Sequence, residues 1–213
     1  MSKTKPFDLY PERYELWFQK NHCVFQSEIN AVKKIIPDFR NGIEVGIGSG
    51  LFAVPLGIPK GVEPSLVMRQ KAEKKGLCVI DSVAEDLPYL SESKDLVLMI
   101  TTVCFLDDIV QAFAEVHRVL KKDGSFIIGF VDKNSPLGQK YLRNKEKSVF
   151  YKDATFYGTE ELLGILKDTG FKTTEIVQTI FGELEKINTI QEVLSGFGKG
   201  SFVVCKNLKN NKI

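Results

Sequence analysis

A glycine-spaced turn carries the clearest chemical signal in this sequence. The stretch 43–50 reads IEVGIGSG, in which a short apolar run leads directly into Gly46, Gly48 and Gly50. Glycine lets a strand turn sharply into a helix and lets the backbone approach a ligand, because a Cβ at Gly46 or Gly48 would occupy the ligand's space. Leu51 stands where a diphosphate-binding G-x-G-x-x-G turn needs its last glycine, so a pyrophosphate cradle is disfavoured.

Two acidic residues accompany this turn. Glu44 precedes the first glycine, where a carboxylate repels a phosphate and attracts an ammonium or sulfonium group. Glu63 lies 17 positions after Gly46, at the end of the second apolar run, where a carboxylate can accept hydrogen bonds from both ribose hydroxyls. Ser65 is then placed to cap the following helix. The indicated ligand is cationic near Glu44 and carries a ribose near Glu63.

Short apolar runs that alternate with helix-like stretches predict the elements that position these residues. Continuous apolar runs are typical of strands covered on both faces, and they lie at 43–45, 61–62, 77–80, 96–100 and 125–131. Two later strands are expected at 174–180 and 201–205, the last antiparallel because little chain is left for a crossover. The predicted fold class is α/β, Rossmann-like, with a seven-stranded mostly parallel sheet and helices on both faces.

Stripes of apolar residues at helical spacing predict three helices that pack on this sheet. One ends at Pro37, one begins after Asp108 and stops at Gly124, and one follows Thr159 and stops at Gly170. The helix after the glycine turn is expected to be only a turn or two long, because prolines and a glycine interrupt 55–59.

Composition and charge narrow the class of protein. Apolar residues make up 43% of the chain and charged residues 26%, which excludes collagen-like and wholly disordered chains. The net charge of +2 is far below the excess expected of a nucleic-acid-binding protein. No export signal and no membrane span are visible, so we expect a cytoplasmic protein with no membrane partner. The four cysteines are widely scattered and are expected to be reduced thiols, and no metal site is predicted.

Together these features resemble the class I S-adenosylmethionine-dependent methyltransferases, and in particular the small-molecule branch called the type 11 domain. The resemblance covers residues 42–171. Its further matches are AEDLPY at 84–89, KDLV at 94–97, the segment 115–124 that ends in RVLKKDG, and the segment 159–171 that begins TEEL and ends GF. The length predicts one domain over 1–213, with a Rossmann-like core at 42–205 and a flexible tail at 206–213. The resemblance implies that the N-terminal helical segment 1–37 is a lid.

The resemblance also implies a cofactor site for S-adenosylmethionine. Gly46 and Gly48 would pass under the methionine part, Glu44 would lie near its amino group, and Glu63 would hold the ribose. Tyr14 from the lid could cover the sulfonium by cation–π attraction. The full set of implied cofactor-binding residues is Tyr14, Trp17, Glu44, Gly46, Gly48, Gly50, Glu63, Pro64, Ala84, Glu85, Thr101 and Thr102, with Ala84 and Glu85 beside the adenine and the two threonines near the sulfonium.

The sequence departs from the family pattern at three places in this site. The family usually places the second acid about 20 residues after the first glycine, and here Glu63 follows Gly46 after 17 positions. Val83 stands where the family carries an Asp or Asn for the adenine amine, which leaves backbone groups or Asp86 for that contact. Cys104 and Phe105 replace a His-His pair, so no catalytic histidine can be carried over. His22, among the aromatic residues of the lid, is a weak candidate for contact with the substrate, and a surface or packing role competes with it. The catalytic residue remains unknown.

The predicted function is methyl transfer from S-adenosylmethionine to a small molecule by in-line displacement, which releases S-adenosylhomocysteine and needs no metal. The sulfonium already activates the methyl group, so the protein chiefly orients the reactants and excludes water. An RNA methyltransferase is one alternative, supported by the basic segment 133–152. A non-catalytic cofactor-binding module is another, and a nicotinamide oxidoreductase is a third. Monomer and homodimer are both left open.

Overall fold

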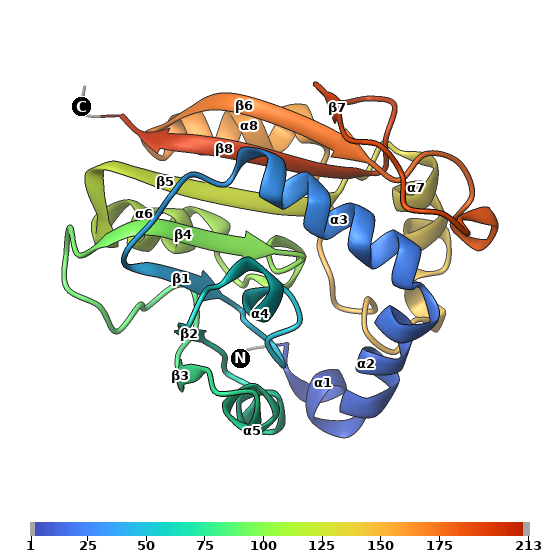
Figure 1. Cartoon of the computed structure of the whole chain (residues 1–213), viewed down its shortest axis with the longest axis horizontal. Helices are drawn as coiled ribbons and strands as arrows, with labels where there is room; N and C mark the ends of the chain where they lie inside the picture. Colours follow the sequence, from blue (N-terminus) through green and yellow to red (C-terminus); the bar gives the residue numbers. More distant parts are fainter. Residues whose placement is uncertain (1–2, 211–213) are drawn as a thin grey trace.

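An eight-stranded sheet lies at the centre of the computed structural model, which describes residues 3–210 (Figure 1). Its strand order is β3-β2-β1-β4-β5-β8-β6-β7. The strands are β1 (Gly42–Val45), β2 (Lys60–Val62), β3 (Cys78–Ile80), β4 (Lys94–Ile100), β5 (Leu120–Val131), β6 (Phe171–Thr179), β7 (Leu194–Ser195) and β8 (Phe202–Lys209).

The pairing confirms the predicted Rossmann-like class and corrects the strand number. Strands β1 to β5 pair in parallel, and β8 pairs antiparallel with both β5 and β6, as the short remaining chain suggested. The eighth strand is β7, which pairs antiparallel with β6 at the sheet edge. A strand of two residues carries no apolar run, so the sequence pattern could not reveal it.

Helices cover both faces of the sheet. In Figure 1, α3 crosses the near face, and α6 and α8 lie behind the strands. The α-helices are α1 (Lys5–Leu9), α2 (Pro11–Lys20), α3 (His22–Ile35), α4 (Ala53–Leu56), α5 (Leu66–Lys74), α6 (Ile109–Val119), α7 (Pro136–Arg143) and α8 (Thr159–Asp168). Short 3-10 turns are η1 (Val103–Phe105), η2 (Lys145–Lys147) and η3 (Leu184–Lys186).

Strand β4 shows why its sequence is continuously apolar. Val97 and Met99 pack in the core that contains α6, whereas Leu98 and Ile100 pack in the core that contains α3. Successive side chains of a strand point to opposite faces, so a strand buried on both faces needs apolar residues at every position. The expectation of a sheet covered on both sides is therefore confirmed.

Several element boundaries differ from the sequence-based expectations. Helix α6 is capped by Asp108, whose Oδ1 accepts a hydrogen bond from the Gln111 N–H at 3.0 Å. It ends at Val119 instead of Gly124, because Leu120 already adopts the extended backbone of β5. Thr159 is the first residue of α8 and donates a hydrogen bond to Asp132. Helix α4 has only four residues, as expected.

The predicted flexible tail is wrong for most of its described part. Residues 206–209 belong to β8 and pair with β5 and β6, and Asn207 is fully buried. The Asn207 side-chain amide donates a hydrogen bond to the Phe126 carbonyl at 3.0 Å, which anchors the end of the strand. Residues 211–213 lie outside the described part of the chain.

Cysteines and helix lengths bear on two further expectations. Cys23, Cys78, Cys104 and Cys205 are all free, and the last two are buried. Within residues 3–210, no helix combines the length and the apolar character that a membrane span requires.

Candidate active site

A cavity of about 650 Å³ opens at the carboxyl ends of the parallel strands. Residues that follow β1, β2, β4 and β5 line it. The strand order changes direction at β1, because the chain continues to β2 and β3 on one side of β1 and to β4 and β5 on the other. Open α/β sheets bind ligands at such switch points, and the volume is that of a small-molecule site. In Figure 1 these strands point toward α1, α2 and α7, which close the cavity from outside.

The cavity has two ends of different chemistry. We call the part beside β1, β2, β3 and β4 the cofactor end; its lining includes Gly46, Gly48, Glu63, Pro64, Ala84, Glu85, Thr101 and Thr102. We call the other part the aromatic end; its lining includes Phe7, Tyr14, Trp17, Glu28, Phe105, Tyr141, Phe150 and Tyr151. Among the residues implied to bind the cofactor, only Glu44 and Gly50 are absent from the lining.

Two glycines of the turn have different roles. Gly46 has a φ of 69°, and a Cβ there would lie 2.5 Å from the Thr102 side chain, so the turn packs against the end of β4. Gly48 has a φ of 55°, and a Cβ there would lie 3.7 Å from the Met68 methyl group and 4.0 Å from the Tyr14 hydroxyl. This Cβ would clash with no residue and would instead take up space in the cavity. Gly48 therefore fits the role of close backbone approach to a ligand.

The third glycine of the turn serves packing. A Cβ at Gly50, whose φ is 80°, would lie 2.3 Å from the Leu77 side chain. Gly50 therefore faces Leu77 and does not face the cavity, so its implied place in the cofactor site is not supported.

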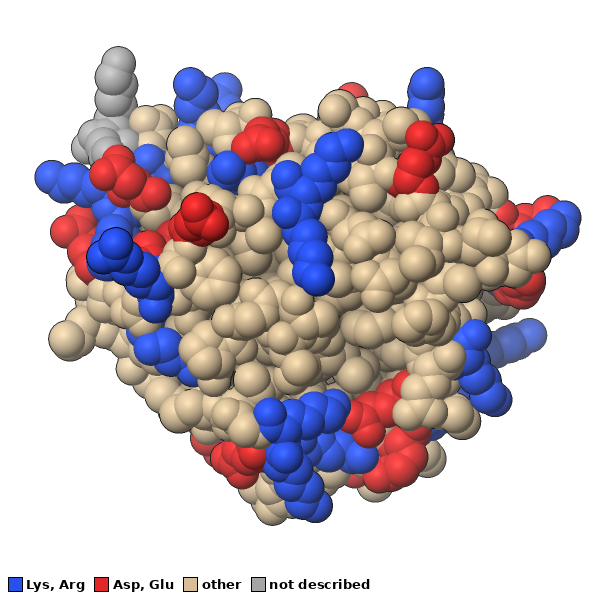
Figure 2. All heavy atoms as spheres, viewed as in Figure 1, with Lys and Arg blue, Asp and Glu red and all other residues tan. Residues whose placement is uncertain are grey.

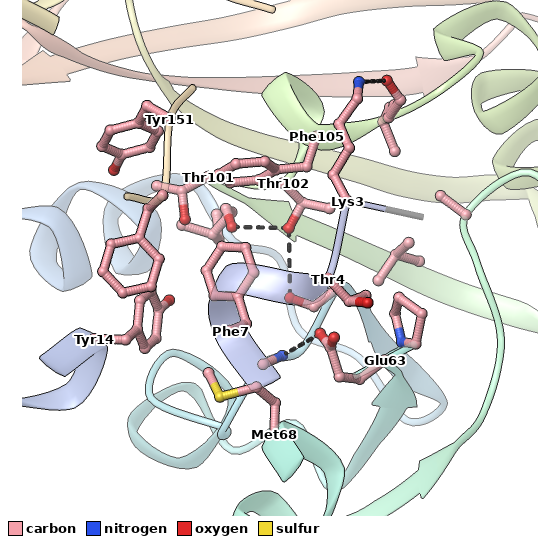
Figure 3. Close-up of a pocket in the computed structure, with 18 of the residues that line it drawn as sticks. Lys3, Thr4, Phe7, Tyr14, Glu63, Met68, Thr101, Thr102, Phe105 and Tyr151 are labelled. Carbon is pink, nitrogen blue, oxygen red and sulfur yellow. Dashed lines mark hydrogen bonds between the residues drawn. The ribbon is translucent and has the colours of Figure 1, made fainter. Parts of the chain in front are cut away.

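Glu63 is held in place by the backbone (Figure 3). Its Oε2 accepts a hydrogen bond from the Gly48 N–H at 2.9 Å, and its Oε1 accepts one from the Ser65 N–H at 2.9 Å. Burial raises the pKa of Glu63 to about 6, although these two N–H groups oppose the rise. Each oxygen keeps a further lone pair, so the carboxylate can accept both hydroxyls of a ribose. Ser65 caps α5 as expected, since its Oγ accepts from the Met68 N–H.

Glu44 does not take the position expected of it. Its neighbour Val45 lines the cavity, whereas Glu44 is not among the lining residues. It is 2% exposed and accepts a hydrogen bond from the Ala53 backbone, while its Oε2 has no partner in the described part of the chain. Burial and the nearby Glu63 raise the pKa of Glu44 well above its usual value. Because Glu44 is absent from the cavity lining, it is not placed to attract a cation bound there as the sequence suggested.

The loop after β3, where the adenine is expected, lies at the cofactor end of the cavity. Ser82, Val83 and the Ala84–Glu85 pair line the cavity, and Asp86 does not, so backbone groups of this loop are left for contact with a base. The Glu85 Oε1 accepts hydrogen bonds from the Asp107 and Asp108 N–H groups at 2.9 and 3.1 Å. Glu85 therefore joins the loop after β3 to the loop after β4.

Thr101 has a strained backbone at the end of β4. Its φ is 52°, which a β-branched residue rarely adopts, and its N–H donates to the Gly129 carbonyl at 2.7 Å. Strain of this kind concentrates at ligand sites. The neighbouring Thr102 donates to the Ile100 carbonyl at 3.1 Å (Figure 3). The sequence placed both residues correctly beside the cavity but gave no sign of the strain.

Aromatic rings from distant segments meet at the aromatic end (Figure 3). Phe7 of α1 contacts Phe105 of η1 and Phe150, with ring centroids 5.2 and 5.3 Å apart. Tyr151 stacks on Phe105 at 6.0 Å and on Tyr141 of α7 at 4.9 Å. The N-terminal helices thus cover the cavity as the expected lid does, and the segment after β5 completes the cover. Phe7 was not singled out in the sequence, because nothing local shows which segment it meets.

Glu28 is a site residue that the sequence analysis missed. It is 5% exposed, lines the cavity from α3, and burial raises its pKa to about 8. None of residues 3–210 donates a hydrogen bond to it or forms an ion pair with it. Val24 and Val32 lie four residues to either side and are buried. A carboxylate within an apolar helical stripe was a signal that could have identified it.

Neither histidine lines the cavity. His22 begins α3 and is exposed, so its suggested contact with substrate is not supported. His117 packs against Phe171 with ring centroids 5.4 Å apart, which is a structural role. In the described part of the chain, no three His, Cys, Asp or Glu side chains gather closely enough to hold a metal ion.

Comparison with known proteins agrees with the geometry. A family model described as a methyltransferase domain matches residues 43–128. A crystal structure from Thermotoga maritima, described as a SAM-dependent methyltransferase and possible histamine N-methyltransferase, is 44% identical, has a TM-score of 0.95 and covers 98% of this chain and 100% of its own. An uncharacterized protein of Methanocaldococcus jannaschii is 44% identical over 92% of this chain and 95% of its own length. A SAM-dependent methyltransferase structure from Aquifex aeolicus, 16% identical with a TM-score of 0.62 over 85% of this chain and 89% of its own, shares the fold.

Proposed function

Because the chain belongs to the S-adenosylmethionine-dependent methyltransferases, we propose that it methylates a small molecule bound at the aromatic end of the cavity. One observation carries the proposal: a single cavity joins the implied cofactor residues to a mostly apolar compartment covered by α1, α2 and the segment after α7. A covered compartment of this size suits a small acceptor whose reacting atom must be held in line and kept from water.

The residues of the cofactor end would hold S-adenosylmethionine, which supplies a methyl group already activated by its sulfonium. Glu63 would accept the ribose hydroxyls, and Gly48 would let the chain pass close beneath the methionine part. Pro64, Ala84 and Glu85 would border the adenosine, and Thr101 and Thr102 would lie near the reacting centre. Tyr14 and Trp17 would exclude water from above. In this proposal the protein contributes binding, orientation and desolvation.

Charge distribution favours a small molecule over RNA as acceptor. Within the basic segment, Lys133 pairs with Glu161 at 2.6 Å and Lys140 pairs with Glu185. On the face shown in Figure 2, basic and acidic side chains are interspersed around a broad uncharged band. An RNA-binding surface would present an unbroken excess of positive charge beside the cavity.

The Thermotoga relative supports a nitrogen atom as the acceptor. It is described as a possible histamine N-methyltransferase, and it matches this chain over nearly its whole length. A small aromatic amine would suit the rings of the aromatic end, because a cation is attracted to the face of an aromatic ring.

Incubation with methyl-labelled S-adenosylmethionine and a cell extract separated into small molecules and RNA tests the proposal. We expect the label in the small-molecule fraction, and we expect Glu63→Ala to abolish most of it. Label confined to RNA would favour the RNA methyltransferase. Tight binding of the labelled compound with no transfer to either fraction would favour a cofactor-binding module.

A further inference from the structure

Glu28 is a buried acidic group for which the fold supplies no partner. It lies on α3 between Val24 and Val32, in the stripe that packs on the sheet, and only 5% of its surface is exposed. It nevertheless belongs to the cavity lining. The carboxyl therefore reaches the cavity from within the apolar core, and the exposed part of its surface faces the place where a ligand would lie.

A buried carboxylate without a partner is unfavourable, so its presence calls for a compensating group. Glu63, which is buried to a similar extent, receives two backbone N–H groups. Glu28 receives no hydrogen bond and no ion pair from the described residues. Buried charges in proteins are normally paired, and an acid that the protein leaves unpaired inside a cavity can be paired by a bound cation.

The two basic residues of the cavity lining, Lys3 and Arg13, do not pair with Glu28. Lys3 donates to the Leu106 carbonyl at 2.8 Å and lies 3.7 Å from Asp107, so it is engaged beside the adenine side of the cavity. Arg13 is on the exposed surface of α2. Neither forms an ion pair with Glu28, and the carboxyl remains available.

Three tyrosines near Glu28 share the cavity lining with it. Burial raises the pKa of Tyr14, Tyr141 and Tyr151, and the charge of Glu28 adds to the rise, so all three stay neutral. These rings come from α2, from α7 and from the segment that follows α7. A negative group in a cavity lined by aromatic side chains favours an ammonium group, which can form an ion pair with the acid and a cation–π contact with a ring.

We infer, on the basis of the proposed function, that Glu28 binds a protonated amine of the methyl acceptor. The acceptor is then a compact amine with an apolar or aromatic body, in which the ammonium group meets Glu28 and the body lies among Tyr14, Tyr141 and Tyr151. Glu28 is assigned here to recognition of the acceptor. A neutral or anionic acceptor of the same shape would leave the acid unpaired and would bind more weakly.

Calorimetry on the protein saturated with S-adenosylhomocysteine tests this inference. The probes are histamine and 2-phenylethylamine, with 2-phenylethanol as the uncharged counterpart of the latter. We expect the wild-type protein to bind at least one of the two amines, and to bind 2-phenylethylamine at least tenfold more tightly than the alcohol. Glu28→Gln, which keeps the shape and removes the charge, should weaken amine binding at least tenfold and leave the affinity for the alcohol unchanged.

Controls separate the inference from the proposed function. Glu160→Gln, which removes an exposed acid from the start of α8, should bind both amines as the wild type does. Glu28→Gln should keep the wild-type affinity for S-adenosylhomocysteine within twofold, which shows that it is folded. Normal S-adenosylhomocysteine binding with no amine binding, or with equal amine binding by wild type and Glu28→Gln, would overturn the inference. No binding of S-adenosylhomocysteine by the wild type would overturn the proposed function itself.

Discussion

The two ends of the cavity each contain a buried glutamate, and they hold it in different ways. At the cofactor end, Glu63 receives hydrogen bonds from Gly48 and Ser65. At the aromatic end, Glu28 receives none from the described residues. The pKa of Glu63 is raised to about 6 and that of Glu28 to about 8, although both side chains are almost fully buried. The Ser65 and Gly48 N–H groups and the charge of Arg69 hold down the pKa of Glu63, whereas no such group in the described part of the chain acts on Glu28.

At the cofactor end, the acid has its hydrogen-bond partners before any ligand binds. At the aromatic end, the acid would gain a partner only when a ligand binds. Glu63 is fixed by its own turn and the glycine turn, so in the proposed site it would present the same two oxygens to every cofactor molecule. Glu28 would depend on the acceptor for its partner, so it would reject molecules that lack a positive charge. A methyltransferase that uses one cofactor and selects one acceptor is served by both arrangements.

The largest effect is expected from substitution of Glu63, and it is an effect on cofactor affinity. Glu63→Ala removes two charge-assisted hydrogen bonds to the ribose, each worth about 1.5 to 3 kcal/mol, so affinity for S-adenosylhomocysteine should fall at least about a hundredfold. Isothermal titration calorimetry measures the change, and Glu160→Gln is the surface control. A dissociation constant equal to that of the wild type would mean that the ribose binds elsewhere.

The second effect is on the stability of the folded protein, and it comes from Glu28 at the aromatic end of the cavity. The pKa of Glu28 is raised from 4.5 to about 8 on folding, so its carboxyl favours the folded state when protonated. The contribution is fully present below pH 4.5 and is lost as the pH rises through 8. Glu28→Gln should therefore be more stable than the wild type by several kcal/mol at pH 9, and the difference should shrink toward pH 4.5.

Urea unfolding of both proteins at pH 5 and pH 9 measures this stability difference. Other titrating groups are common to the two proteins and largely cancel. A difference that stays constant between the two pH values would show that Glu28 is not the buried, unpaired acid described above.

Two glycines of the same turn give a smaller and more specific contrast. Gly48→Ala places a methyl group in the cavity and should weaken S-adenosylhomocysteine binding about tenfold. Gly50→Ala places its methyl group against Leu77 and should lower stability by about 1 to 3 kcal/mol. Calorimetry and thermal unfolding of both variants measure the two effects. Equal effects of the two substitutions on affinity would remove the distinction between the glycine that faces the ligand and the glycine that packs.

The smallest effect is expected at His22. His22→Ala changes an exposed residue outside the cavity, so kcat/KM for the identified acceptor should stay within about twofold of the wild type. Steady-state kinetics measures it. A large loss of kcat would show that His22 contacts the substrate, and this contact would require the start of α3 to move toward the cavity.

The sequence could indicate which residues of the cofactor end line the cavity, because the signals there are local. Gly46, Gly48 and Glu63 directly follow apolar strands, and parallel strands bring their carboxyl ends to one edge. Glu44 lies outside the lining and accepts a hydrogen bond from the Ala53 backbone, a contact that the sequence could not show. Gly50 was misjudged because its reason is Leu77, which lies far from it in the sequence.

The aromatic end could not be derived in the same way. Phe7, Phe105 and Tyr151 come from three separate segments, and only the folded chain brings their rings together. Glu28 did carry a local signal, since an acid stands within an apolar helical stripe, but the stripe alone indicates packing. A binding role for Glu28 is indicated only by the folded structure, in which the cavity extends to α3.

A crystal structure of the protein with S-adenosylhomocysteine tests most directly the division of the cavity between cofactor and acceptor. We expect both ribose hydroxyls within hydrogen-bond distance of the Glu63 carboxylate, the sulfur beside Thr101 and Thr102, and open space between the sulfur and Glu28. A ligand bound with its sulfur away from the aromatic end, or with its ribose away from Glu63, would contradict that division.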